Sequence, residues 1–208
     1  MGEIVAQQAW YTCGRVSMNN PALFLKKFLR YGTTIASVAP SSVWLSRATI
    51  STIDWSCPRI ILELGAGTGP ITAEILKKAT PESRVIAVEQ DADFAAHLRV
   101  RFSRYKNLEI IHGDVSELAR YLKGRGIDKV DYIISGLPVP SFTGEAQQAL
   151  FRSVRAVLKQ DGSFNQITEF PLLYKRIYKK WFKDVRFIFE PRNIPPAGVY
   201  ICRNMQEP

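Results

Sequence analysis

Short apolar runs alternate with amphipathic stretches along the chain after residue 58. The apolar runs have the length and the branched aliphatic content of buried strands, whereas the stretches between them place apolar residues at helical spacing. This pattern predicts strands at residues 59–64, 84–89, 108–112, 130–135, 163–168, 185–190 and 198–203. It predicts helices at residues 70–78, 91–105, 115–123, 144–158 and 172–182.

Regular alternation of strands and helices favours a parallel sheet that is covered by helices on both faces. The last two predicted strands have no long helix between them, which indicates an antiparallel addition to the sheet. We therefore expect an α/β fold with a seven-stranded, mostly parallel sheet.

The N-terminal part of the chain lacks this alternation. Residues 1–19 show no period and are interpreted as a disordered leader. A helix is expected from Asn20, because Asn caps helices and Pro21 suits the first turn. A second short helix is expected after Pro40, with Ser41 or Ser42 as its cap.

Composition restricts the partners and excludes some sites. The net charge of +9 favours an anionic partner, and both nucleic acid and an anionic membrane surface qualify. The odd set of Cys13, Cys57 and Cys202 fits no disulfide or metal framework, and with only two histidines no metal site is expected. No apolar run approaches the length that crosses a bilayer.

A glycine-rich loop, Gly65-Ala66-Gly67-Thr68-Gly69, follows the first predicted strand and opens a helix. Glycine lets the backbone turn sharply and approach a ligand closely, and such a ligand lies at the carboxyl end of the strands. The third glycine comes one residue earlier than in the dinucleotide fingerprint, and no Walker-type Lys-Ser/Thr follows. Binding of a pyrophosphate is therefore the less favoured interpretation.

Acidic residues lie at the ends of three predicted strands. Glu89 ends the second strand, where a carboxylate can accept hydrogen bonds from both hydroxyls of a ribose. Asp114 follows the third strand and can meet an adenine amino group, while Glu63 can lie near the cationic end of the same ligand. The alternative is that Glu63 and Asp114 only cap helices or loops.

Together these residues resemble the class I methyltransferases, over residues 59–203. The resemblance implies a Rossmann-like fold, S-adenosyl-L-methionine as cofactor and S-adenosyl-L-homocysteine as its product. It places the cofactor contacts at Glu63, Gly65, Ala66, Gly67, Gly69, Glu89, Gln90, Gly113, Asp114, Val115 and Ser135.

The fourth predicted strand ends in Ser135-Gly136-Leu137-Pro138, a loop that in this fold class lies beside the transferable methyl group. Enzymes that methylate amines of nucleic acids often carry Asn/Asp-Pro-Pro-Tyr there, with an aromatic residue that stacks on a flipped base. The loop here lacks that aromatic residue, which argues against a nucleobase substrate. The alternative is that the loop is a proline-rich turn with no role in substrate binding. An rRNA adenine N6-dimethyltransferase, or another nucleic-acid methyltransferase, remains the alternative function, favoured by charge.

Several segments are similar to the bacterial phospholipid N-methyltransferases, namely residues 39–42, 135–138, 166–168 and 192–200. This resemblance implies N-methylation of the amine of phosphatidylethanolamine, repeated to phosphatidylcholine, or of a related amino-lipid such as an ornithine lipid. Candidate residues that position the amine are Ser135, Gly136, Leu137 and Tyr174, and candidate lipid contacts are Pro138, Asn193 and Tyr200. No dedicated general base is evident, and both histidines are interpreted as structural.

A phospholipid substrate requires contact with a membrane. Residues 20–31 combine bulky apolar residues with Lys26, Lys27 and Arg30, as expected of a helix in an anionic headgroup layer. The basic, aromatic helix at 172–182 fits either the membrane interface or packing on the sheet. We predict a leader at 1–19, membrane-facing amphipathic helices at 20–55 and a methyltransferase domain at 56–208. We expect no nucleic acid partner and a peripheral location on the cytoplasmic face of the cell membrane.

Overall fold

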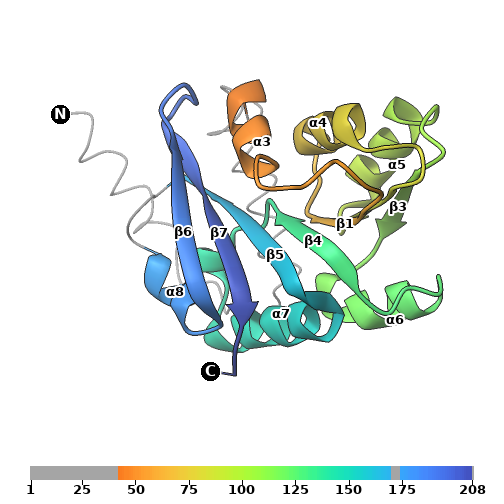
Figure 1. Cartoon of the computed structure of the whole chain (residues 1–208). Coiled ribbons are helices and arrows are strands. Elements are labelled where there is room, and N and C mark those ends of the chain that lie inside the picture. The colour runs from red at the N-terminus through yellow and green to blue at the C-terminus, as the bar shows by residue number, and fades with distance from the viewer. Residues whose placement is uncertain (1–41, 170–173, 208) are drawn as a thin grey trace.

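The computed structural model describes residues 42–169 and 174–207. In this part of the chain seven strands form one sheet, in the order β3-β2-β1-β4-β5-β7-β6 (Figure 1). The predicted leader and the predicted helix at residues 20–31, with Lys26, Lys27 and Arg30, lie outside the described residues. The predicted boundary between residues 55 and 56 therefore stays a prediction.

The strands are β1 Ile60–Leu64, β2 Arg84–Glu89, β3 Leu108–His112, β4 Val130–Ser135, β5 Leu158–Thr168, β6 Phe182–Glu190 and β7 Ala197–Met205. The helices are α3 Val43–Thr49, α4 Pro70–Lys78, α5 Ala92–Arg101, α6 Leu118–Lys123, α7 Gly144–Val157 and α8 Lys175–Lys179, with 3-10 turns η1 Val115–Glu117 and η2 Val139–Ser141. Strands β1 to β5 are parallel, and β7 pairs antiparallel with both β5 and β6. The predicted α/β class and the antiparallel addition are confirmed.

Helices cover both faces of the sheet, as the unbroken apolar strands require (Figure 1). Ile61 and Leu62 are adjacent on β1 and point to opposite faces, and both side chains are fully buried. Ile61 packs in the core on the side of α4 and α5, and Leu62 packs in the core on the side of α6, α7 and α8.

The predicted helix at residues 172–182 is wrong at its C-terminal end. Helix α8 spans only Lys175–Lys179, and Phe182 already begins β6. Tyr178, Trp181 and Phe182 are buried, and Trp181 stacks on Phe151 of α7 with ring centroids 5.2 Å apart. These aromatic residues belong to the core, so of the two interpretations of this segment, packing on the sheet holds for Tyr178 and Trp181. Packing of the rings on the sheet outweighs the local helical pattern.

One edge of the sheet collects the features that matter for function. The carboxyl ends of the parallel strands meet there, and β6 runs in the same direction as β5, so the loop after Glu190 reaches the same edge. Helix α3 begins beside that loop, because the backbone N–H of Ser42 donates to Oδ1 of Asn193 at 3.0 Å. The Ser42 hydroxyl also caps α3 by accepting from the N–H of Leu45, one of the two caps that the sequence predicts.

Candidate functional site

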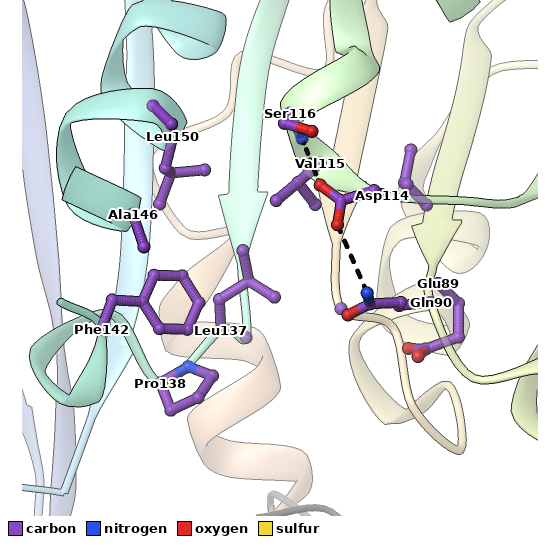
Figure 2. Close-up of a pocket in the computed structure, with 14 residues that line it drawn as sticks. Glu89, Gln90, Asp114, Val115, Ser116, Leu137, Pro138, Phe142, Ala146 and Leu150 are labelled. Atoms are coloured by element: carbon purple, nitrogen blue, oxygen red, sulfur yellow. Dashed lines mark hydrogen bonds between the residues drawn. The ribbon is translucent and has the colours of Figure 1, made fainter. Parts of the chain in front are cut away.

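A cavity opens at the carboxyl edge of the sheet, between β1, β2 and β4 and the start of α7. Figure 2 shows one wall with Gln90, Asp114 and Val115 and the facing wall with Phe142 and Ala146. The lining residues are Gly65, Val88, Glu89, Gln90, Asp114, Val115, Ser116, Gly136, Leu137, Pro138, Phe142, Ala146, Ala149 and Leu150. The cavity therefore lies where a ligand of a doubly wound α/β sheet is expected.

The backbone holds the carboxylate of Glu89 in place at the end of β2. Its Oε2 accepts from the N–H of Gly67 at 2.8 Å, and its Oε1 accepts from the N–H of Asp91 at 2.9 Å. A carboxylate offers about four lone-pair positions, so two remain for a ligand. Glu89 is almost fully buried, and a charge-assisted hydrogen bond to a ligand hydroxyl is strong in such surroundings.

Two glycines are required by geometry in this region. Gly67 has φ +54°, a left-handed conformation, and a Cβ placed there would meet no atom within 4 Å. Gly136 comes so close to the glycine loop that a Cβ would lie 2.9 Å from the carbonyl oxygen of Gly65. The first glycine leaves open space above the loop, and the second lets the β4 loop pack against it.

Asp114 and Gln90 form the polar wall of the cavity. Oδ1 of Asp114 accepts from the N–H of Ser116 at 2.7 Å, and Oδ2 accepts from the side-chain amide of Gln90 at 3.3 Å (Figure 2). Nε2 of His112 lies 3.1 Å from the carbonyl oxygen of Gln90, a contact in line with a structural role for His112. Asp114 therefore both caps η1 and lines the cavity.

Glu63 lies beneath the cavity and not in its wall. Its side chain is fully buried, and Oε2 accepts from the hydroxyl of Thr72 on α4 at 2.7 Å. Oε1 has no hydrogen-bond partner among the described residues. Burial raises the pKa of Glu63 to about 7, opposed by the hydrogen bond from Thr72 and reinforced by the charge of Glu89.

The loop after β4 is held by hydrogen bonds to its backbone. The Ser135 hydroxyl is buried and accepts from the N–H of Leu137 at 3.3 Å. The Leu137 carbonyl accepts from the N–H of Val139 and from the side-chain amide of Gln166, both at 2.8 Å. Gln166 lies beside Ser135 in the sheet, so β5 fixes the position of this loop.

The apolar wall of the cavity was not predicted from the sequence. Phe142, Ala146, Ala149 and Leu150 lie along the start of α7 and face the cavity (Figure 2). Ala146 and Leu150 are four residues apart, the spacing of one helical face, and that spacing was the available signal. This wall offers an apolar surface to a flat ring.

Several predicted site residues lie elsewhere in the fold. Ala66, Gly67, Gly69, Gly113 and Ser135 flank the cavity without lining it; Gly69 is the N-cap of α4. Tyr200 is fully buried, with its ring 4.9 Å from that of Tyr178. The side chain of Asn193 is engaged by Ser42 and by the Pro195 carbonyl, to which it donates at 2.6 Å. Tyr174 is the N-cap residue of α8 and is half-buried.

The cavity suits a nucleoside with a charged tail. Glu89 offers lone pairs to ribose hydroxyls, the apolar wall and Leu137 suit a base, and the space above Gly67 is open. The uncompensated oxygen of Glu63 adds negative potential below the loop once it is ionised. Over the described residues, no group of three or more His, Cys, Asp or Glu side chains could hold a metal ion.

Three of the matches to known proteins, of decreasing similarity, bear on this site. An ornithine lipid N-methyltransferase from Singulisphaera acidiphila is 54% identical over 185 residues, which cover 89% of this chain and 96% of that protein. A ribosomal RNA small subunit methyltransferase A from Thermotoga neapolitana is 29% identical over 61% of this chain and 45% of its own length. The crystal structure of Aeropyrum pernix fibrillarin with natively bound S-adenosyl-L-methionine has a TM-score of 0.57, with 18% identity and 76% of each chain covered.

A family model described as a methyltransferase domain matches residues 61–162, the part of the chain that carries the glycine loop, Glu89, Asp114 and the β4 loop. Identity of 54% over nearly the full length of both proteins is far above what shared architecture alone produces. The structural likeness supports the fold. The chain is a class I methyltransferase that uses S-adenosyl-L-methionine, and it belongs to the same family as the ornithine lipid N-methyltransferase of Singulisphaera acidiphila.

Proposed function

We propose that this enzyme methylates the amine of an amino-lipid, with an ornithine lipid as the first substrate to test. The observation that carries the proposal is the 54% identity to an ornithine lipid N-methyltransferase over 89% of the chain. The sequence resemblance alone favoured phosphatidylethanolamine, which has the same kind of primary amine. Both head groups place a small amine beside an anionic lipid surface.

The cavity residues take the following roles in this proposal. Glu89 binds the ribose hydroxyls, and Asp114 with Gln90 meets the polar edge of the adenine. Leu137, Phe142 and Ala146 enclose the base, while the backbone of the glycine loop passes beneath the methionine part. These assignments rest on the bonds that hold Glu89 and Asp114 and on the shape of the cavity.

The β4 loop is suited to hold the amine that becomes methylated. The Leu137 carbonyl already accepts two hydrogen bonds, and the Pro138 carbonyl accepts from the N–H of Ser141 at 2.9 Å. The Gly136 carbonyl accepts no hydrogen bond from a described residue, so we assign it as the acceptor that orients the amine. Leu137 and Pro138 exclude water from the nitrogen, which favours its neutral form.

The bound cofactor supplies an electrophilic methyl group on a sulfonium. The Gly136 carbonyl would hold the amine nitrogen toward this methyl group. Transfer would leave S-adenosyl-L-homocysteine, and the proton of the product ammonium would pass to water. The chain contributes alignment and a dry site, and no covalent intermediate with a side chain is needed. A second transfer would need a fresh cofactor and could use the remaining N–H of the monomethyl amine on the Gly136 carbonyl; a dimethyl amine has no N–H, so a third transfer would depend on the shape of the site alone.

The enzyme works at a membrane surface in this proposal, peripherally and on the cytoplasmic face. In residues 42–169 and 174–207 no helix is both long enough and apolar enough to span a bilayer. The net charge of +9 favours an anionic leaflet.

A ribosomal RNA substrate is the second candidate, because shorter matches to small subunit methyltransferases A support it. The matched region covers about half of those proteins, and the β4 loop here has Leu137 and Pro138 where a base-stacking aromatic would be expected.

Labelled cofactor distinguishes the candidates. The purified enzyme is incubated with labelled S-adenosyl-L-methionine and, separately, with ornithine lipid, phosphatidylethanolamine and small subunit rRNA, with both lipids dispersed in detergent. We expect label in ornithine lipid above all. Label in rRNA alone would refute the lipid proposal, and label in phosphatidylethanolamine alone would keep the reaction and change the head group.

A further inference from the structure

Exposed apolar side chains occupy two adjoining segments at the carboxyl edge of the sheet. Val43 and Trp44 begin α3 and are 50% and 44% exposed, and Ile194 in the loop between β6 and β7 is 72% exposed. In Figure 1, α3 and this loop stand next to each other at the same end of the molecule. Water is a poor solvent for such a group of side chains, which is typical of a contact surface.

The two segments are held together rigidly. The guanidinium of Arg192 lies over the ring of Trp44, 4.0 Å from its centroid. Arg192 is itself fixed by the buried carboxylate of Glu190, with two hydrogen bonds of 2.7 Å. Asn193 holds the backbone at the start of α3, as described above. Ile194 therefore has a defined place beside Trp44.

Two arginines, each paired with a carboxylate, present guanidinium groups on this surface. The guanidinium of Arg47 also lies near the Trp44 ring, 5.6 Å from its centroid, and it pairs with Glu74 at 3.0 Å. The side chains of Arg47 and Arg192 are each more than half exposed. An indole near two guanidinium groups, with an exposed isoleucine in the adjoining loop, combines apolar and cationic side chains in the way that anionic bilayer interfaces favour.

Its location links this surface to the active site and to the N-terminal segment. The cavity opens at the same edge of the sheet. Residues 20–31, predicted to lie in the headgroup layer, precede α3 by only eleven residues, which span at most about 40 Å when extended. A bilayer that holds the predicted helix is therefore within reach of Trp44.

We propose that Val43, Trp44, Arg47, Arg192 and Ile194 form a docking surface for an anionic lipid bilayer. This surface turns the carboxyl edge of the sheet, and with it the cavity, toward the lipid head groups. The proposal rests on the proposed lipid substrate. It assigns the membrane contact that was predicted for the helices at residues 20–55 as a whole to named side chains of α3, and it adds the loop between β6 and β7.

Flotation with vesicles tests the surface directly. The vesicles contain phosphatidylcholine and phosphatidylglycerol in equal amounts, and the full-length chain is compared with three variants. Ile194→Ser and Trp44→Ser alter the docking surface, whereas Val100→Ser on α5 is the matched control, because Val100 is a branched aliphatic residue that is 78% exposed. We expect Ile194→Ser and Trp44→Ser to lower vesicle partitioning at least about threefold, with Val100→Ser equal to wild type.

Each outcome decides one point. Equal flotation of Ile194→Ser and Val100→Ser would overturn the docking surface. Unchanged flotation with lowered thermal stability would show that other residues of this chain cover Trp44 and Ile194, and this too would overturn it. Methylation of detergent-dispersed ornithine lipid tests the substrate separately. If wild type methylates no lipid while Ile194→Ser still loses vesicle binding, the docking surface stands and the proposed function fails.

Discussion

The backbone N–H of Gly67 donates a hydrogen bond of 2.8 Å to Oε2 of Glu89. This bond joins the glycine loop after β1 to the acid that ends β2, so the two elements that would hold opposite sides of a ribose form one unit. The second oxygen of Glu89 is held by the N–H of Asp91. Because both contacts join a backbone N–H to a buried carboxylate, the site is organised before a ligand binds.

Substitution of this acid should weaken cofactor binding. Glu89→Gln keeps one carbonyl oxygen for the backbone donors but loses the charge and one acceptor, so we expect the Kd for S-adenosyl-L-methionine to rise about 10- to 100-fold. Titration calorimetry measures the change, and the melting temperature without cofactor is the control for folding. An unchanged Kd in a folded variant would remove the ribose assignment.

The open space at Gly67 predicts a selective effect of an added methyl group. Gly67→Ala forces an L-residue to φ +54°, which costs on the order of 1 kcal/mol, and its Cβ meets no atom of the chain. Gly126→Ala is a matched control, since Gly126 has φ +67° and equally open space, but its N–H donates to the Lys123 carbonyl and not to the cavity residue Glu89. We expect similar losses of stability in denaturant unfolding and a loss of cofactor affinity in Gly67→Ala only. Equal affinities would mean that the loop does not contact the ligand.

The elements that position the site were predictable from sequence because they carry local signals. The glycine loop, Glu89 and Asp114 each follow an apolar run, and parallel strands bring their carboxyl ends to one edge. The apolar wall of α7 escaped prediction, because Ala146 and Leu150 have the same helical spacing whether they face a cavity or the core.

Long-range tertiary contacts determine the positions of residues that the local sequence pattern could not predict. Trp181 and Phe182 read as a continuation of a basic, aromatic helix, yet they are buried with Phe151. Asn193 was a candidate lipid contact, and its side chain is engaged by α3, 151 residues away in the chain. No periodicity of a single segment reports on such long-range partners.

Glu63 predicts a pH dependence of stability without cofactor. Its pKa is raised from 4.5 to about 7, because burial disfavours the carboxylate. The folded chain then binds this proton more tightly than the unfolded chain, so the contribution of Glu63 is fully present below about pH 4.5 and is lost as the pH rises through about 7. The loss is on the order of 3 kcal/mol.

Glu63→Gln should abolish this dependence, because an amide does not titrate and its oxygen can still accept from Thr72. We expect the variant to be more stable than wild type at about pH 8 and close to it at about pH 5, as measured by urea unfolding. Glu82→Gln, at an exposed turn, is the control. If Glu63→Gln shows the same difference in unfolding free energy between the two pH values as wild type, the pH dependence comes from other groups.

The basic residues of the predicted N-terminal helix should contribute a salt-dependent part of membrane binding. Charge attraction is screened within about 8 Å at physiological salt, so flotation with anionic vesicles should fall as salt rises. Reversal of Lys26, Lys27 and Arg30 to Glu should remove that dependence and most of the binding at low salt. Flotation of this triple variant equal to that of wild type at low salt would exclude an electrostatic role for residues 20–31.

The apolar residues of the same segment should contribute a part of the membrane binding that salt does not screen. Phe24→Ser combined with Phe28→Ser removes two rings, each worth about 1.5–3 kcal/mol when fully buried, so binding at high salt should fall steeply. Cofactor affinity, measured in parallel, reports whether the variant is folded. If this double variant and the charge-reversed variant both float and methylate vesicle lipid normally, residues 20–31 do not anchor the enzyme. Any remaining vesicle binding would then have to come from the surface around Trp44 and Ile194, where the Ile194→Ser and Val100→Ser pair measures it independently.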